Sequence, residues 1–212
     1  ASAIDRDALV AALAVPGLAP RATVLEPGLD NLRDPASPDW AAVPLTDRRE
    51  QLQSAVQDLF GSDEKPTIRI ALPDGPGADM LFNRLSQDWG VLGFTVERVG
   101  KGESADLALV DRVAPSSSPA WFLRSFRCGV VPVCDSQVDE MLDGARDTAI
   151  LAQRIALLDA ASKRIDSLQL FIPITAPIRW SLVSPRITGF AGNRFAIHTL
   201  TGLEERLERT SE

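Results

Sequence analysis

The sequence predicts an α/β domain in which a sheet is flanked by helices. Residues 67–72 (TIRIAL) alternate between apolar and polar side chains, as a strand does, and residues 78–89 carry apolar side chains at helical spacing. A second strand is predicted at 94–99, directly after this helix, and a third, short apolar strand at 106–110. Strand, helix and strand joined by short connections predict a βαβ unit in a sheet.

The composition is that of an acidic, folded protein. The chain has 212 residues, of which 45% are hydrophobic and 24% charged, and this is enough for a sizeable core. Its 22 basic residues are dispersed among 29 acidic ones, giving a formal net charge of -7 that argues against a nucleic-acid partner. No apolar run approaches the roughly 20 residues that span a bilayer. The N-terminus lacks the charged and apolar regions of a signal peptide. We therefore expect no nucleic-acid binding and no membrane insertion.

The first part of the chain is predicted to hold two helices separated by a long loop. Residues 4–13 place apolar side chains on one helical face. Prolines recur throughout residues 15–44 and exclude a regular helix, so we expect an extended loop laid against the body of the protein. A helix is predicted over residues 47–60, with Thr46 as its cap and Gly61 after its end.

The second half is predicted to be mostly helical, with strands near its end. Its clearest pattern belongs to a long helix, which places Ile150, Leu151, Ile155, Leu158 and Ile165 on one side. The expected elements are helices at 120–126, 135–142 and 148–165, strands at 168–174 and 178–183 that prolines interrupt, and a solvated helix or frayed end at 204–212.

Two motifs that could bind a metal or a phosphate are better explained as structure. His198, the one histidine, has no Cys, Asp or Glu near it at ligand spacing, which argues against a zinc or iron site. Residues 74–77 (DGPG) follow a predicted strand and precede a helix, as a phosphate loop does. However, Pro76 lacks an amide donor and no Lys follows, so a structural turn is favoured.

Two pairs of carboxylates could be imagined as acid and base. They are Asp5 with Asp7, and Asp139 with Asp143, and both pairs lie on predicted helix surfaces, near helix starts or beside arginines. Solvated helix faces explain them better. No Ser or Cys has a neighbouring base, so we expect no enzymatic activity, no cofactor and no metal.

Several short segments follow one another in an order that is typical of one protein family. They are residues 3–10 (AIDRDALV), 89–97 (WGVLGFTVE), 106–111 (DLALVD), 119–123 (PAWFL) and 134–142 (CDSQVDEML), with a long helix from Arg154 onward. The series resembles the second, C-terminal lobe of extracytoplasmic solute-binding proteins of the peptide/nickel/opine family, which serve ABC importers. The resemblance covers most of residues 3–200.

This resemblance implies a fold, a function and a location. Residues 1–200 would form a periplasmic-binding-protein-like lobe, a mixed sheet flanked by helices, and residues 201–212 a C-terminal tail. The first lobe of the much longer family members would be missing. The chain would capture a peptide or related small solute by cleft closure between two lobes, and deliver it to ABC permease subunits from the periplasm. Fold-level analogy carries this expectation.

The resemblance also places a ligand site at the end of the third predicted strand. In peptide-binding relatives, an Asp in an aromatic-x-x-Asp motif pairs with the α-amino group of the ligand, and Asp111 occupies that position. Ala108 stands where the aromatic residue is expected, and Leu109 follows it. The residues alone leave a second role open for Asp111, as the cap of a turn. Because Ala108 offers no ring, a solute other than a peptide also stays open.

The two cysteines bear on location. Taken by their spacing alone, Cys128 and Cys134 leave buried thiols and a disulfide both open. In some relatives two cysteines flank the same loop, so the resemblance implies a disulfide, which fits an oxidising periplasm. The alternative function is the ligand-sensing domain of a cytoplasmic transcriptional regulator, and a reduced cysteine pair would favour it.

Overall fold

Three parallel strands and the helices beside them form the βαβ unit that the sequence predicts. The computed structural model describes residues 1–61, 65–100, 102–176, 178–193 and 202–205. Strand β1 (Thr67–Ala71) lies between β2 (Thr95–Val99) and β3 (Leu107–Ala108) in the order β2-β1-β3, and both pairings are parallel. Helix α3 (Pro76–Gly90) connects β1 to β2. The α/β fold class is therefore confirmed, and this sheet is parallel where a mixed sheet was expected.

The local rules that predict this unit also set its bounds. Pro76 is the first residue of α3 and Gly75 before it has φ +131°, so residues 74–77 form the expected structural turn. Strand β3 is shorter than the predicted strand at 106–110, because its partner strand β1 ends at Ala71. Leu109 still donates to the carbonyl of Ala71, where β1 ends, and Pro73 has no amide to offer.

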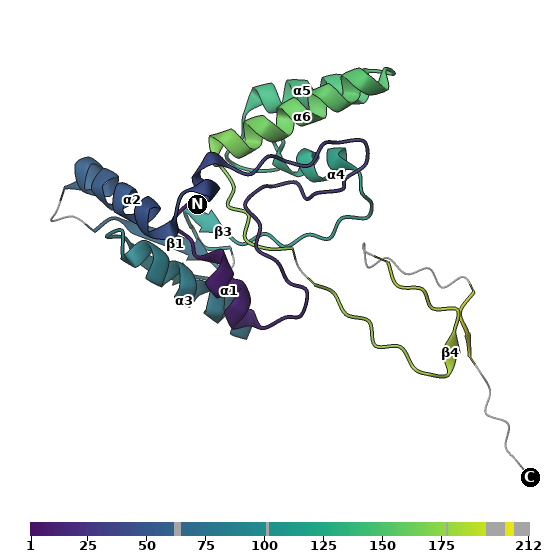
Figure 1. Cartoon of the computed structure of the whole chain (residues 1–212), viewed down its shortest axis with the longest axis horizontal. Coiled ribbons are helices and arrows are strands. Elements are labelled where there is room, and N and C mark those ends of the chain that lie inside the picture. Colours follow the sequence, from purple (N-terminus) through teal and green to yellow (C-terminus); the bar gives the residue numbers. More distant parts are fainter. Residues whose placement is uncertain (62–64, 101, 177, 194–201, 206–212) are drawn as a thin grey trace, which may run out of the picture.

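Helices α1 (Arg6–Leu13) and α2 (Leu45–Phe60) lie with α3 beside the sheet (Figure 1). Asp5 caps α1 by accepting a hydrogen bond from the amide of Ala8 at 2.9 Å. The predicted cap of α2 is wrong. Pro44 occupies the cap position, and the Thr46 hydroxyl donates to the carboxylate of Asp47 instead.

A buried carboxylate joins these helices to the N-terminal segment. Asp88 of α3 is 0% exposed and forms ion pairs with Arg49 of α2 and with Arg84 of its own helix, the latter at 2.7 Å. It also accepts a hydrogen bond from the amide of Asp5 at 2.8 Å. One buried side chain therefore holds α2, α3 and the start of α1 together.

The helices of residues 119–168 form a second part of the molecule, apart from the sheet (Figure 1). Helices α5 (Ser136–Asp147) and α6 (Leu151–Leu168) lie against each other, with α4 (Pro119–Leu123) and the 3-10 turn η2 (Arg124–Phe126) beside them. Helix α5 runs past its predicted end at Leu142. Leu157 lies against Gly144, where an added Cβ would stand 3.2 Å from its side chain.

Two separate hydrophobic clusters hold the two parts. The sheet cluster buries α1, β1 and α3 side chains, including Leu9, Ile70 and Trp89. The helical cluster buries side chains of α4, α5 and α6, together with Leu25 and Leu29 of the proline loop. Two residues of the predicted apolar side of the long helix, Ile150 and Leu151, are exposed and the prediction for them is wrong.

The proline loop lies against the body, as expected. Apart from the 3-10 turn η1 (Asp39–Ala42), it has no regular structure between α1 and α2. The amide of Arg21 donates to the carbonyl of Ile174 at 2.9 Å, and the amide of Val24 donates to Asp166 of α6 at 3.1 Å. The loop thus crosses from the sheet cluster to the helical cluster.

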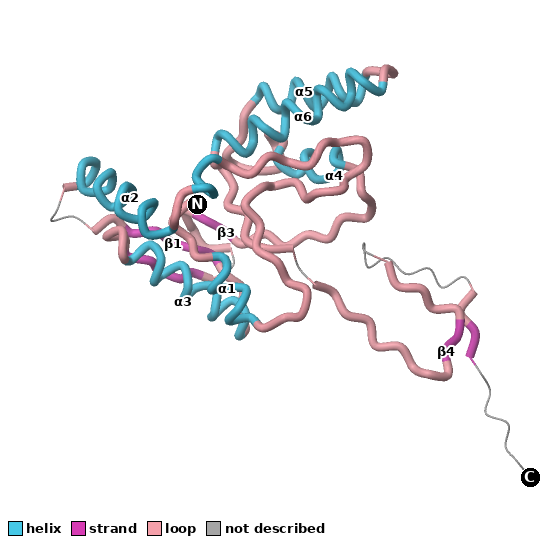
Figure 2. The backbone as a smooth tube through the Cα atoms, in the orientation of Figure 1, coloured by secondary structure: helices cyan, strands magenta, loops and turns pink. Residues whose placement is uncertain are grey.

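The predictions for the C-terminal strands are wrong. Helix α6 continues to Leu168, and the next residues pack against the two clusters as an extended segment whose one bridge joins Thr175 to Pro20. The described residues from 178 onward extend away from the body (Figure 2). They include an antiparallel pair, β4 (Ile187–Thr188) with β5 (Glu204–Glu205). Strand β5 lies at the start of residues 204–212, where a helix or frayed end was expected. His198 and residues 206–212 lie outside the described residues.

Candidate functional site

The carboxyl ends of the parallel strands meet at one edge of the sheet, where α/β folds commonly bind ligands. Strand β3 ends at Ala108, so Ala108, Leu109 and Asp111 all lie at or just beyond this edge. All three are exposed. The structure thus places the three residues singled out in the sequence together, on an accessible surface.

Asp111 has a cationic partner that the sequence did not indicate. The guanidinium of Arg179 lies 3.5 Å from its carboxylate, and the two side chains are 49% and 60% exposed, respectively. This ion pair brings together the end of β3 and the segment after α6. An anion and a cation side by side can accept both ends of a zwitterion.

A second charged group lies at the same edge, after β1. Arg98, near the end of β2, donates to the carbonyl of Pro73 at 2.6 Å and forms an ion pair with Asp79 in the first turn of α3. Asp74 lies 3.8 Å from the same guanidinium, and its side chain is fully exposed. Arg98 therefore fixes the turn before α3 to the sheet, which is a structural role.

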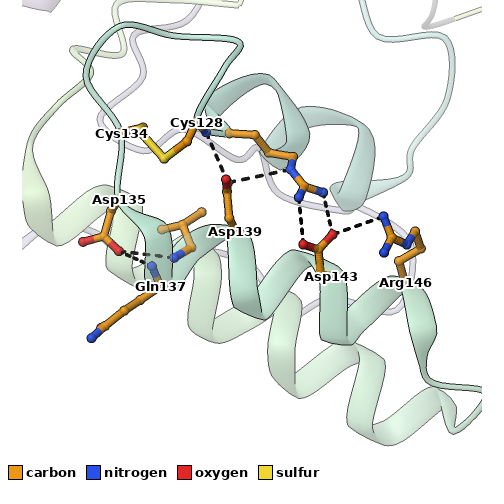
Figure 3. A network of polar contacts seen from close by, with 9 residues as sticks. Cys128, Cys134, Asp135, Gln137, Asp139, Asp143 and Arg146 are labelled. Atoms are coloured by element: carbon orange, nitrogen blue, oxygen red, sulfur yellow. Dashed lines mark hydrogen bonds and ion pairs between the residues drawn. A yellow bond between two sulfur atoms is a disulfide. The ribbon is translucent and has the colours of Figure 1, made fainter.

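A further network of polar contacts surrounds the cysteine loop (Figure 3). Cys128 and Cys134 are joined by a disulfide, with their Cα atoms 5.2 Å apart, so the expected pairing is confirmed. The amide of Cys128 donates to Asp139 of α5 at 3.2 Å. The disulfide loop is therefore attached directly to helix α5.

Arg127 contacts both Asp139 and Asp143, the two carboxylates that could be imagined as an acid and base. Its guanidinium donates to both oxygens of Asp143, at 2.8 and 2.9 Å, and lies 3.7 Å from Asp139. The hydrogen bond from Arg127 is the main cause that holds the pKa of the Asp143 carboxyl below its usual range. A carboxyl that acts as a general acid near neutral pH needs a raised pKa. The two carboxylates thus lock the cysteine loop onto α5.

Asp135, at the start of α5, is held in the same way. Its carboxylate accepts hydrogen bonds from the amides of Gln137 and Val138 and from the guanidinium of Arg164 on α6. The bond from Arg164 is the largest cause that lowers the pKa of Asp135. This side chain is a helix cap that also joins α5 to α6.

We predict that the contribution of Asp143 depends on pH. Its folded pKa lies below the unfolded value of about 3.9, so its stabilisation is fully present above that pH and disappears as pH falls through the folded pKa. Asp143→Asn should unfold at lower urea concentration than the wild type at pH 7. This difference in urea midpoint between the two proteins should disappear in acid. Glu140→Gln, at an exposed position on the same helix, is the control and should unfold at the same urea concentration as the wild type. If the difference between Asp143→Asn and the wild type persists in acid, the ion-pair account is contradicted.

Neither metal ligation nor membrane crossing is indicated in the part of the chain that the structure describes. Among those residues, no group of three or more His, Cys, Asp or Glu side chains is arranged to hold a metal ion. No helix there has both the length and the apolar character that a bilayer crossing requires.

Comparison with known proteins finds similarity in structure alone. No protein-family profile and no curated protein matches the chain. Solved structures do match. The Escherichia coli murein tripeptide binding protein MppA superposes with a TM-score of 0.77 at 15% identity, over 89% of this chain and 40% of that one. The dipeptide binding protein of Pseudoalteromonas sp. SM9913, in complex with Met-Leu, gives 0.73 at 18% identity, over 96% and 43%.

A third match names a transport system. The periplasmic oligopeptide-binding protein of an oligopeptide ABC transporter from Borrelia burgdorferi gives a TM-score of 0.65 at 16% identity, over 82% of this chain and 38% of that one. The chain thus spans about 40% of the length of these structures and has the fold of that part. The expected fold, one lobe of a peptide/nickel-type solute-binding protein, is confirmed.

Proposed function

We propose that the chain is the ligand-capturing lobe of an extracytoplasmic solute-binding protein that delivers a peptide or a related small solute to an ABC permease. The observation that carries the proposal is the fold, which the chain shares with peptide-binding proteins of known structure over most of its length. The chain performs no chemistry in this function. It contributes one wall of a cleft that a second lobe closes.

The ion pair of Asp111 and Arg179 supports a zwitterionic solute. In the chain alone both side chains face water, where a pair at 3.5 Å contributes little. When a second lobe closes over them and excludes water, their charge-assisted hydrogen bonds to a ligand become stronger. Asp111 would then hold the ammonium group of the solute, and Arg179 its carboxylate.

The disulfide supports the proposed location. Disulfides persist in oxidising compartments such as the periplasm and are rare in the cytosol. The bond between Cys128 and Cys134 therefore favours an extracytoplasmic binding protein over the ligand-sensing domain of a cytoplasmic regulator. Two of the matched structures are described as periplasmic proteins.

We predict that Asp111→Asn, made in the complete two-lobed protein, weakens solute binding at least about tenfold, or ~1.4 kcal/mol. Asparagine keeps the shape and an acceptor oxygen but carries no charge, so it cannot form an ion pair with an ammonium group. Removing one charge of a desolvated pair typically costs ~2–5 kcal/mol. Calorimetric titration with a set of dipeptides and tripeptides, using the tightest binder, measures the effect.

Asp74→Asn is the matched control, because Asp74 lies at the same edge of the sheet with a fully exposed side chain. Its dissociation constant should equal that of the wild type. If Asp111→Asn leaves both the dissociation constant and the melting temperature unchanged, Asp111 caps a turn and is not part of the site. If no peptide in the set binds the complete protein, the peptide assignment is wrong.

A further inference from the structure

A groove of about 670 Å³ lies between residues 32–40 of the proline loop and the second half of α6. This volume is in the range of small-molecule sites. None of the residues that line the groove belongs to the Asp111 edge of the sheet or to the cysteine loop. A molecule bound here would therefore be separate from the solute of the proposed function.

The two walls of the groove differ in polarity. Helix α6 contributes a polar stripe, in which the residues are spaced i, i+3, i+4 and i+7 and so share one face of the helix. The stripe consists of Asp159, Ser162, Lys163 and Asp166. The opposite wall comes from the loop and is mostly apolar, with Pro35, Pro38 and Trp40 among its residues. A ligand would therefore meet polar groups on one side and apolar surface on the other.

Ser162 is the buried member of the polar stripe. The residue is only 5% exposed, and its hydroxyl has no hydrogen-bond partner among the described residues. Buried polar groups are nearly always hydrogen-bonded, because an unmade bond costs the desolvation of the group. This hydroxyl is not one of the unpaired atoms that the described residues seal from water, so it opens onto the groove that Ser162 lines. A polar group bound in the groove would complete its hydrogen bonding.

Asp166 lies one helical turn after Ser162 and has an unused oxygen. Its Oδ1 atom accepts a hydrogen bond from the amide of Val24 at 3.1 Å, whereas Oδ2 has no partner among the described residues. Burial is the largest influence on the pKa of this carboxyl and raises it above its usual value. A hydrogen-bond donor that carries a positive charge would offset this cost of burial.

The charges around Asp166 leave its carboxylate without an ion pair among the described residues. Arg21, whose charge acts on Asp166, pairs with Glu26 at 3.5 Å, and Lys163 pairs with Asp159 at 2.7 Å. The groove as a whole is lined by four carboxylates and two basic side chains. Its charge therefore favours a cation over an anion.

We propose that this groove binds an organic amine, with the ammonium group between Ser162 and Asp166 and the apolar body against the loop wall. A protonated amine has several N–H donors, so it can donate to the Ser162 hydroxyl and to Asp166 Oδ2 at the same time. A metal ion fits less well, because no group of three or more His, Cys, Asp or Glu side chains among the described residues is arranged to hold one. The bound amine would join the proline loop to α6.

The test is a titration of the isotope-labelled 212-residue chain with phenethylamine at neutral pH, followed through amide chemical shifts. We expect saturable shifts centred on the α6 residues of the groove. Phenethyl alcohol has the same ring without the charge, and methylamine has the charge without the ring. Each should bind at least about tenfold more weakly than phenethylamine. The absence of saturable shifts in α6 would overturn the proposal, and equal binding of the alcohol would overturn its assignment to an ammonium group.

Two variants locate the ammonium group. Asp166→Asn keeps an acceptor for the amide of Val24 but removes the charge, and should raise the dissociation constant of phenethylamine at least about tenfold. Ser162→Ala removes only the hydroxyl and should raise the constant severalfold, which keeps the test decisive even if Asp166→Asn does not fold. Glu140→Gln, at an exposed position of α5 outside the groove, should leave the constant unchanged.

Two outcomes of these variants would contradict the proposal. If Asp166→Asn and Ser162→Ala both bind phenethylamine as the wild type does, the polar stripe does not hold the ammonium group. If Glu140→Gln weakens binding as much as Asp166→Asn, the amine responds to the overall charge of the protein and not to this groove.

Discussion

Replacing Asp88 by alanine is expected to lower the free energy of unfolding by about 3–5 kcal/mol, because it removes one partner from a buried charge network. The wild-type carboxylate is fully buried, pairs with Arg49 and Arg84, and accepts the amide of Asp5. Alanine would leave two guanidiniums and one amide without this acceptor. Urea unfolding followed by far-ultraviolet circular dichroism measures the loss.

Two further variants separate charge from shape. Asp88→Asn keeps an acceptor for the amide of Asp5 but loses the charge, so its stability should lie between those of the wild type and Asp88→Ala. Asp79→Ala removes an exposed carboxylate of the same helix that pairs with Arg98. It should cost no more than about 1 kcal/mol. If Asp88→Ala costs as little as Asp79→Ala, the buried network does not hold these helices together.

We expect Leu25→Ala to cost about 2–5 kcal/mol, which is the range for a buried leucine truncated to alanine. Leu25 lies in the proline loop, yet it is 0% exposed and packs into the helical cluster with Leu123, Val138 and Leu158. Alanine would leave a cavity beneath α4 and α5. Urea unfolding with the disulfide kept oxidised measures the effect.

Leu182→Ala is the control for this prediction. Leu182 lies in the extended C-terminal segment and is fully exposed, so its truncation should change the free energy of unfolding by less than about 0.5 kcal/mol. Equal losses from the two variants would mean that the proline loop is not anchored through Leu25.

The elements predicted well from the sequence are those fixed by local pattern. Residues 67–72 alternate, Pro76 suits the first turn of a helix, and α3 repeats apolar side chains at helical spacing. These rules act within a few residues, so a βαβ unit could be inferred without any knowledge of tertiary contacts. The disulfide followed from resemblance to a family rather than from spacing.

The wrong predictions concern residues whose state depends on distant partners. The apolar stretch at 168–174 reads as a strand, but its side chains pack against two clusters and α6 occupies its first residue. Leu25 carries no periodic signal, because the loop around it is irregular. Burial there is decided by tertiary packing, which overrides local preference.

The candidate sites show the same division. Asp111 could be singled out because its position matches a motif of peptide-binding relatives, whereas Arg179, which pairs with it in the structure, lies far along the chain with no local signal.

The separation of the two hydrophobic clusters has a consequence for local unfolding. Among the described residues, no buried side chain belongs to both clusters, so we expect α4, α5, α6 and the Leu25 segment to open as one unit while the sheet and α3 stay closed. Proteins commonly exchange amide hydrogens through such sub-global openings, whose free energies lie below that of complete unfolding. The crossing loop at residues 20–25 would then act as the hinge between two units of different protection.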